Sequence, residues 1–471
     1  MRLSVKETIT PRKLIAGYEA LCKKYLPIDS NDVWRFSRQI LAAEPDQGWK
    51  IHISATIHTA GKVLEKVAPV LKKQNVFFKA PRSLTELGKI NSGMFYGYGQ
   101  IGKFITVYPQ NEEEFVRLAE TLHQSTRGLA APVIPFDLRY EESSNVYYRY
   151  GAFTNLDIKE ADGTLTPAIF DPNGTLVPDV RNNEKGKPEW ISNPLSFKMT
   201  TDESDTKSPL KTTYKIFKSL SQRGKGGVYM ALDFSSRQPR LCVIKEGCRN
   251  GELNWLGRDG YDYVKREAEV SEQLSSARLG LPEKYETFES DSNLYLVTEY
   301  IEGKNLQEFL AERKRRLSLK KVLEYSYKLA SLIEKIHAAE WVWHDCKPAN
   351  IIVTKNGNLR LLDFEGAYRK NETSHIVWGT DDFLPSEWKP DSQKKNPASF
   401  DLFALGAVIY YLYCGRFYTN NDFSPFYKMR RRSISPVLEK IVVALLEKNP
   451  EKRPSAKTAA RLLRKELELR G

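Results

Sequence analysis

The chain has 471 residues, 41% of them hydrophobic, and a net charge of +13. This length allows two or three domains, each with its own core. No apolar run approaches the roughly 20 residues that cross a bilayer, and the N-terminus lacks the apolar core of a signal peptide. The five cysteines are scattered, without a C-x-x-C pair or histidines at zinc-ligand spacing. We therefore expect a reduced, cytoplasmic protein without a metal cluster and without a membrane partner.

The positive charge alone says little about function. Basic chains often bind nucleic acid, phosphate groups or acidic peptides, but a solvated basic surface explains most of these lysines as well. The sequence contains no basic stripe interleaved with aromatic residues and no nucleic-acid motif, so we expect no nucleic-acid partner.

Residues 1–45 contain two helical patterns, Pro11–Lys24 and Asn31–Ala43. After them, short alternating segments rich in β-branched and aromatic residues predict strands, and apolar residues at helical spacing predict helices between them. The sequence therefore predicts an α+β domain over residues 46–155. Its expected strands are Trp49–Ala55, Asn75–Pro81, Gly102–Tyr108 and Asn145–Tyr150, and its expected helices are Lys62–Lys73 and the Asn-capped Glu112–Ser125.

Residues 156–210 are rich in Asp, Pro, Gly, Asn and Lys and have no sustained period. This composition predicts a long irregular connector with pieces of extended chain. We expect the tract Thr200–Lys211 to be its most flexible part. From Tyr214 onward, all segments fit one further unit.

Residues 343–366 read W-H-D-C-K-P-A-N-I-I-V-T-K-N-G-N-L-R-L-L-D-F-E-G, a spacing typical of a phosphoryl-transfer site. Asp345 is followed by Lys347 and Asn350, and a short hairpin then returns to Asp363 at the end of an apolar strand. A kinase needs a carboxylate near the acceptor hydroxyl, a cation on the transferred phosphoryl group and two oxygen ligands for Mg²⁺. We predict that Asp345 and Lys347 are catalytic and that Asn350 and Asp363 bind the metal.

A glycine-rich turn and a strand lysine precede this motif. Glycines let backbone N–H groups approach the nucleotide phosphates, and the lysine then reaches the phosphate oxygens. A glutamate on the following helical segment is the expected partner of that lysine, and a later strand looks like the one that leads into the adenine-binding hinge of protein kinases. The predicted nucleotide site consists of Gly224, Gly226, Gly227, Lys245, Glu267, the gatekeeper Thr298, Glu299 and Ile301.

Together with G-T-D-D-F-L-P-S-E (379–387), F-D-L-F-A-L-G (400–406) and N-P-E-K-R-P-S (449–455), these motifs resemble the eukaryotic-type protein kinases. The resemblance implies a two-lobed kinase fold that uses ATP or GTP with Mg²⁺, with an N-lobe over residues 211–302 and a C-lobe over residues 303–471. It also implies a buried helix Asp and an ion pair between Glu387 and the Arg of the last motif. W-H-D replaces H-R-D, D-F-E replaces D-F-G, and the glycine motif is incomplete, but every residue expected to touch Mg²⁺ or the γ-phosphate is present.

The first 200 residues carry a second polar constellation. Lys50 and His52 lie two apart on one strand and so face the same side. Such a cluster suits β-elimination of phosphate from phosphoserine or phosphothreonine. Lys79 is the candidate base, because neighbouring cations would lower its pKa, and His52, as imidazolium, is the candidate acid for the departing phosphate. The expected phosphate-binding residues are Lys50, Lys103, Tyr108, Arg139 and Arg149.

Each of these residues has a plainer explanation: an exposed strand-edge lysine, a core histidine, a surface arginine. The strings W-K-I-H-I-S-A, V-F-F-K, G-K-F-I-T-V-Y-P, D-L-R-Y and Y-R-Y-G-A-F nevertheless resemble, in this order, the N-terminal lyase domain of class III lanthipeptide synthetases. D-P-N-G-T-L-V-P-D-V-R (171–181) is similar to the connector of that family. The K-x-H and F-K pieces also resemble the phosphothreonine lyases of bacterial effector proteins. The implied fold is a phosphothreonine-lyase-like α+β domain followed by the kinase.

The resemblance implies a two-step dehydration of a ribosomal precursor peptide, which consists of a leader and a core containing Ser, Thr and Cys. The kinase phosphorylates Ser or Thr, and the lyase expels phosphate to leave dehydroalanine or dehydrobutyrine. Family members carry a further cyclase-like domain, whereas this sequence stops after a helix at 455–469, so we expect ring closure to be spontaneous or catalysed by a separate cyclase. A Ser/Thr kinase with an N-terminal substrate-docking domain and a non-catalytic scaffold stay as alternatives, and a homodimer stays open.

Overall fold

The chain divides into two compact units in a computed structural model. One unit comprises residues 1–229, 245–262 and 289–294, and the other comprises residues 230–244, 263–288 and 295–471. Among the described residues, no helix is long and apolar enough to cross a membrane. The structure describes residues 10–29, 33–41, 44–154, 156–180, 186–196, 208–275, 279–372, 379–387, 396–419 and 435–470.

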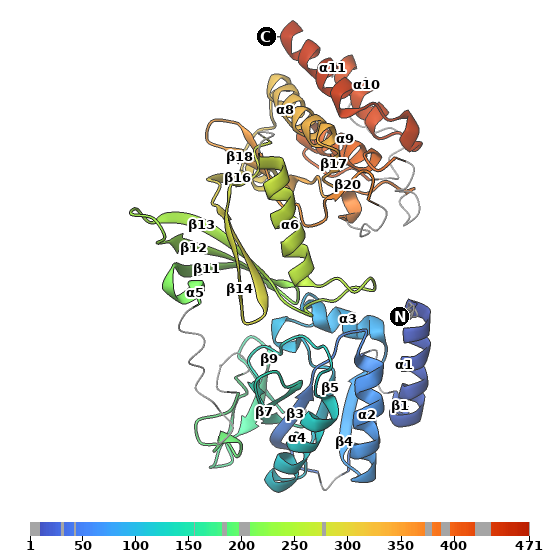
Figure 1. Cartoon of the computed structure of the whole chain (residues 1–471), viewed down its shortest axis with the longest axis vertical. Helices are drawn as coiled ribbons and strands as arrows, with labels where there is room; N and C mark the ends of the chain where they lie inside the picture. Colours follow the sequence, from blue (N-terminus) through green and yellow to red (C-terminus); the bar gives the residue numbers. More distant parts are fainter. Residues whose placement is uncertain are drawn as a thin grey trace, which may run out of the picture. The chain divides into compact units, whose positions relative to one another are not determined.

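A seven-stranded sheet organises the described part of the first unit, with the order β1-β2-β4-β5-β3-β7-β6 (Figure 1). Every second residue of a strand faces the same side of the sheet, and on one side these residues are apolar. They include Ile51, Phe78 and Val107, which belong to the same core as the buried residues of the helices. The helices therefore cover one face of the sheet, and the other face carries the polar residues of the same strands. The strands are β1 (Ile28–Asp29), β2 (Trp34–Phe36), β3 (Gln47–Ile53), β4 (Phe77–Pro81), β5 (Ile105–Tyr108), β6 (Leu138–Arg139) and β7 (Val146–Ala152), and the helices are α1 (Pro11–Tyr25), α2 (Ala60–Lys73), α3 (Leu84–Ser92) and α4 (Glu112–Thr126).

The α+β prediction for this region is confirmed, including the cap of α4, where the Asn111 side chain accepts a hydrogen bond from the backbone of Glu114. The predicted helix Asn31–Ala43 is wrong. Part of it lies outside the described residues, and Trp34–Phe36 forms strand β2. The physical reason is pairing: β2 lies antiparallel to β4, with Trp34 opposite Pro81, so the sheet overrides the local helical pattern.

The connector is more regular than predicted. A three-stranded sheet with the order β10-β9-β8 forms within it, because turns around Gly163 and Gly174 fold the extended pieces back on one another. Residues 200–207 of the tract expected to be flexible lie outside the described residues, and the short helix α5 (Pro209–Thr212) follows. The strands are β8 (Asp157–Lys159), β9 (Leu165–Phe170) and β10 (Leu176–Pro178).

A five-stranded sheet with the order β11-β12-β13-β15-β14 follows in the sequence. The lysine predicted to bind phosphate lies on β13, and the gatekeeper lies on β15. Helix α6 (Gly260–Leu274) matches the predicted helical segment. The strands are β11 (Tyr214–Arg223), β12 (Gly226–Asp233), β13 (Arg240–Gly247), β14 (Lys284–Ser290) and β15 (Asn293–Glu299).

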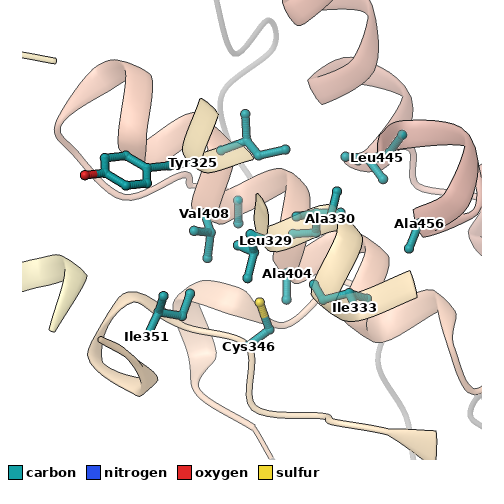
Figure 2. Packing of buried hydrophobic residues seen from close by; sticks show 14 of the residues in the cluster. Tyr325, Leu329, Ala330, Ile333, Cys346, Ile351, Ala404, Val408, Leu445 and Ala456 are labelled. Atoms are coloured by element: carbon teal, nitrogen blue, oxygen red, sulfur yellow. The ribbon is translucent and has the colours of Figure 1, made fainter. Parts of the chain in front are cut away.

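Helices dominate the second unit, and their apolar residues form its core (Figure 2). Figure 2 shows Leu329 and Ile333 of α8 close to Ala404 and Val408 of α9, with Cys346 of the catalytic motif beside them. The catalytic loop is thus anchored on the core. The helices are α7 (Leu306–Ala311), α8 (Leu319–Ala338), α9 (Ser399–Cys414), α10 (Pro436–Leu445) and α11 (Ala456–Leu469), and the strands are β16 (Gly303–Asn305), β17 (Trp341–Val342), β18 (Ile351–Thr354), β19 (Leu359–Leu361) and β20 (Tyr368–Arg369).

Candidate active sites

The polar face of the seven-stranded sheet aligns five side chains in one row. Lys79 on β4 pairs with Thr106 on β5, and Thr106 pairs with His52 on β3. His52 also pairs with Tyr147 on β7, which pairs with Arg139 on β6. Directly paired residues of antiparallel strands point to the same face. The candidate base, the candidate acid and a candidate phosphate-binding arginine therefore share one surface.

A second row lies two residues along the same strands and so faces the same side. Lys50 pairs with Arg149, and Tyr108 pairs with Phe77. Burial raises the pKa of Tyr108, so its hydroxyl stays protonated and available as a donor. The sheet thus gathers most of the predicted lyase residues, and Lys103, just before β5, reaches the group through an ion pair.

Asp137 joins Lys103 to His52. Its Oδ2 lies 2.5 Å from His52 Nδ1, and its Oδ1 lies 3.1 Å from Lys103 Nζ. The Asp137 side chain is 1% exposed. Burial raises the pKa of Asp137, but Lys103 and His52 offset this effect and hold the pKa below its usual value. Asp137 is absent from the residues predicted by sequence. It precedes Arg139 in the D-L-R-Y string, and an acidic residue beside a basic cluster was the signal available.

His52 differs from expectation in its protonation state. Burial, together with the charges of Lys103 and Lys50, lowers its pKa to about 3 against the opposing effect of Asp137. The imidazole is therefore neutral in the free site, whereas the sequence led us to expect imidazolium. The K-x-H motif does not show whether its histidine is buried, so the sequence could not predict this effect of desolvation on the pKa.

Arg149 is engaged by a carboxylate rather than open to a ligand. Its guanidinium makes two hydrogen bonds with Asp179, of 2.6 and 3.3 Å, and both side chains are buried. Asp179 follows β10, so this pair ties the connector to the sheet. Arg139 donates from Nε to the Ser144 carbonyl at 2.9 Å and lies over the Tyr147 ring. The ammonium of Lys79 lies 4.6 Å from the centre of the Trp34 ring.

The glycine-rich turn lies against the C-terminal end of α3 within the first unit. The Gly224 N–H donates to the Ser92 carbonyl at 3.0 Å, and a Cβ on Gly224 would lie only 1.7 Å from the Asn91 carbonyl oxygen. Only glycine fits there. The Asn91 side chain donates to the Ala55 carbonyl at 3.0 Å and accepts from the Gly102 N–H at 3.2 Å.

The other two glycines of the turn also lie in close contacts, with backbone at Gly226 and with a side chain at Gly227. Gly226 has a φ of +140°, and a Cβ there would lie 1.9 Å from the Glu246 carbonyl oxygen. Gly227 would bring a Cβ within 2.1 Å of the Tyr229 hydroxyl. Lys245 belongs to the same unit as this turn. Glu267, its expected partner, is a buried residue of α6 in the other unit, so their pairing stays a prediction.

The catalytic loop of the second unit gathers its predicted polar groups around Asp345. Lys347 Nζ lies 2.7 Å from Asp345 Oδ2, and Asn350 Nδ2 donates to the same oxygen at 2.8 Å. Thr380 accepts from Lys347 at 3.0 Å and donates to Asp345 Oδ1 at 3.3 Å. Thr380 lies in the G-T-D-D string, and its contact with the loop was not predicted. Burial raises the pKa of Asp345, which suits a proton acceptor.

Asp401 of α9 holds the backbone that leads into Asp345. Its carboxylate accepts from the backbone N–H of Trp343 at 2.9 Å and of His344 at 2.7 Å, and it lies 2.9 Å from His337 Nε2. His344 has a φ of +68°, an uncommon conformation for a side-chain-bearing residue. The buried helix Asp expected from the sequence therefore stabilises a strained turn next to Asp345, the predicted catalytic carboxylate.

Asn350 and Asp363 suit Mg²⁺ by the chemistry of their donors. Because Asn350 uses its amide nitrogen toward Asp345, its carbonyl oxygen is the atom left to act as a ligand. Asp363 adds a carboxylate, and oxygen donors of this kind are those that Mg²⁺ prefers. The φ of Asp363 is +63°, and its carbonyl accepts from Trp343 Nε1 at 3.1 Å.

The residues predicted to form the hinge lie in the second unit. Thr298 and Ile301 are buried. The Glu299 carboxylate pairs with Arg360 through two hydrogen bonds, of 2.6 and 3.2 Å, so its backbone is the part suited to a nucleotide. The predicted ion pair between Glu387 and Arg453 is confirmed, and the Arg453 side chain is fully buried.

Comparison with known proteins assigns a family to each part of the chain. Residues 19–207 match the family described as RamC, N-terminal domain, and residues 214–463 match the protein kinase domain. The chain is 32% identical to the "Probable SapB synthase" of Streptomyces coelicolor over 362 residues, which cover 74% of this chain and 38% of that protein. It is 31% identical to serine/threonine-protein kinase PknA of Nostoc sp. over 221 residues, which cover 44% of this chain and 38% of that kinase.

Serine/threonine-protein kinase D of Synechocystis sp. is 28% identical over 262 residues, covering 52% of this chain and 50% of that kinase. The chain therefore spans half or less of the length of these relatives. It belongs to the protein kinase family, with a RamC-type domain ahead of the kinase domain. This combination, with the similarity to a SapB synthase, confirms the resemblance to the class III lanthipeptide synthetases at the level of the family.

Proposed function

We propose that the chain dehydrates Ser and Thr residues of a ribosomal precursor peptide in lanthipeptide biosynthesis, by phosphorylation followed by elimination of phosphate. The observation that carries the proposal is the row Lys79–Thr106–His52–Tyr147–Arg139 on the polar face of the sheet. A substrate-docking domain alone has no need for a candidate base, a candidate acid and a phosphate-binding arginine in one row.

In the first step, Asp345 accepts the proton of the peptide hydroxyl, and Lys347 neutralises charge on the transferred phosphoryl group. Thr380 and Asn350 fix the orientation of Asp345 by hydrogen bonds. ATP or GTP would be held by the glycine-rich turn, by Lys245 and by the backbone of the hinge. Mg²⁺, when bound by Asn350 and Asp363, disperses the charge of the phosphates.

In the second step, neutral Lys79 takes the Cα proton of the phosphorylated residue. The C–H electron pair forms the Cα=Cβ bond, the Cβ–O bond breaks, and its electron pair leaves on the phosphate oxygen. His52 donates a proton to that oxygen. Lys50, Lys103, Tyr108 and Arg139 hold the dianion and disperse its charge. Lys79 then returns its proton to solvent, and His52 regains one.

Substrate binding would itself prepare His52. The free imidazole is neutral because it is buried near two lysines. A phosphate dianion beside it would offset those charges and raise its pKa, so that the acid is loaded only when the leaving group is present. Because Arg149 is paired with Asp179, we assign Arg149 the role of holding the connector against the sheet.

The test is a synthetic phosphoseryl peptide offered to the purified chain without nucleotide. We expect inorganic phosphate and a peptide 98 Da lighter than the phosphopeptide, the mass of phosphoric acid. Asp363→Asn should keep this activity while losing phosphorylation of the unmodified peptide, and Lys79→Ala and His52→Ala should do the reverse and accumulate phosphopeptide. If the wild type leaves the phosphopeptide intact, the lyase assignment is wrong. A docking domain would then remain, and the two substitutions would change affinity without trapping an intermediate.

A further inference from the structure

We propose that Asp137 is the positioning residue of the elimination site, holding His52 in the tautomer whose Nε2 acts on the leaving phosphate. This inference rests on the proposed lyase function. At neutral pH an aspartate carboxylate only accepts hydrogen bonds. The 2.5 Å contact between Asp137 Oδ2 and His52 Nδ1 therefore places the ring hydrogen on Nδ1. Nε2 is left to receive a proton and to pass it on.

The backbone around Asp137 is arranged to deliver this carboxylate. Phe136, immediately before it, has a φ of +65°, which costs free energy for a residue with a side chain. The Phe136 ring packs edge-on against the Tyr98 ring, with 5.8 Å between the ring centres, and this contact helps to hold the turn. The Asp137 side chain is buried, and burying a charge is expensive unless specific partners compensate it. Its two partners are the candidate acid and a candidate phosphate ligand.

The charges around His52 explain why the carboxylate is needed. Lys50 on β3 and Lys103 before β5 disfavour an imidazolium, and Asp137 is the group that favours it. Tyr147 and Thr106 flank His52 on the neighbouring strands and are neutral. Without Asp137, the incoming phosphate alone would have to offset both lysines and the burial of the ring. With Asp137, part of this opposing charge is already offset before the phosphate arrives, so the phosphate has less left to compensate.

A purely architectural role is the competing explanation, because the ion pair with Lys103 also anchors the segment that carries Arg139. The two explanations differ in how mutational effects combine. If Asp137 acts through His52, its loss has no further effect once His52 is gone. If it only supports the segment, the two losses multiply.

The experiment measures kcat/KM for phosphoserine elimination in the wild type, Asp137→Asn, His52→Ala and the double variant. We expect Asp137→Asn to lose about 100-fold, within the usual range for a general acid, and the double variant to match His52→Ala within about threefold. The high-pH limb of the kcat profile, which reports the enzyme–substrate complex, should move to lower pH in Asp137→Asn, because its imidazole holds a proton less well. Asp171→Asn removes a charge from an exposed turn of the same unit and should change neither quantity.

Phosphorylation of the unmodified peptide by each variant reports whether the chain is folded. Should Asp137→Asn fail to fold, ¹⁵N NMR of the wild-type imidazole decides, with a protonated Nδ1 expected for His52. A protonated Nε2 with a bare Nδ1, an unshifted pH profile, or multiplying losses would each overturn the role of Asp137. A wild type that releases no phosphate would instead overturn the lyase function.

Discussion

Replacing Asp401 with alanine should destabilise the second unit and slow phosphorylation together. Asp401 is 1% exposed and accepts two backbone hydrogen bonds, from Trp343 and His344, besides its contact with His337. Hydrogen bonds to a charged group are worth about 1.5–3 kcal/mol each, and removing one partner of a buried ionic group costs about 3–5 kcal/mol. We therefore expect a loss of about 4 kcal/mol for Asp401→Ala and about half of that for Asp401→Asn, which keeps one acceptor.

The catalytic effect follows from the strained His344, which lies next to Asp345. Once its N–H loses Asp401, the turn with a φ of +68° is free to relax and carries the catalytic carboxylate with it. A shift of about 1 Å costs roughly 100-fold in rate. Urea unfolding followed by tryptophan fluorescence measures the stability, and mass spectrometry of the phosphopeptide measures the rate. Glu302→Ala, at an exposed ion pair, is the control. Asp401→Ala with wild-type stability and rate would refute the reasoning.

Three further perturbations test other parts of the structure. Arg149→Leu and Asp179→Leu should each cost about 3–5 kcal/mol, and the double variant should cost less than either in urea unfolding, since neither charge is then left buried alone; additive losses would contradict this. Burial lowers the pKa of His52 to about 3 from 6.5, so the unfolded chain binds more protons than the folded chain between these pH values. The free energy of unfolding should therefore fall as the pH drops from 6.5 towards 4, by up to about 1.4 kcal/mol per pH unit. Thermal denaturation at each pH should show a flatter slope for His52→Gln, and an unchanged slope would count against the buried neutral imidazole. Gly224→Ala should slow phosphorylation and lower the free energy of unfolding by about 1–3 kcal/mol, because its Cβ overlaps a carbonyl oxygen. The control Gly17→Ala, in open space on α1, should be neutral or slightly stabilising. Equal effects of the two substitutions would argue against the close approach at Gly224.

Local pattern is enough to predict the pieces of the lyase-like site but not their alignment. Alternation along β3 suffices to put Lys50 and His52 on one face of that strand. The position of Lys79 relative to His52 depends on the strand order β4-β5-β3 and on the register through Thr106. Register across non-consecutive strands is set by packing of the whole sheet, which no short motif encodes.

The residues that sequence analysis missed were missed for a common physical reason. Asp137 and Asp179 lie outside regular strands, and their roles arise from contacts with residues far away in the chain. Asn31–Ala43 fails for the related reason that a short strand such as β2 gains its stability from the strands β1 and β4 on its two sides, not from its own period. In the kinase-like unit, by contrast, Asp345, Lys347 and Asn350 lie within six residues of one another, so a local motif captures most of that geometry.

The contact between Gly224 and the C-terminal end of α3 has a practical consequence for engineering. The hairpin turn that should cover the nucleotide belongs to the same compact unit as the seven-stranded sheet, and Asn91 at the end of α3 bonds to Ala55 and Gly102, near the ends of strands β3 and β5. A chimera joined in the connector would therefore separate this hairpin from the helix end on which it rests. Modular exchange of kinases between such enzymes should transfer α3 along with the hairpin, or redesign both surfaces together.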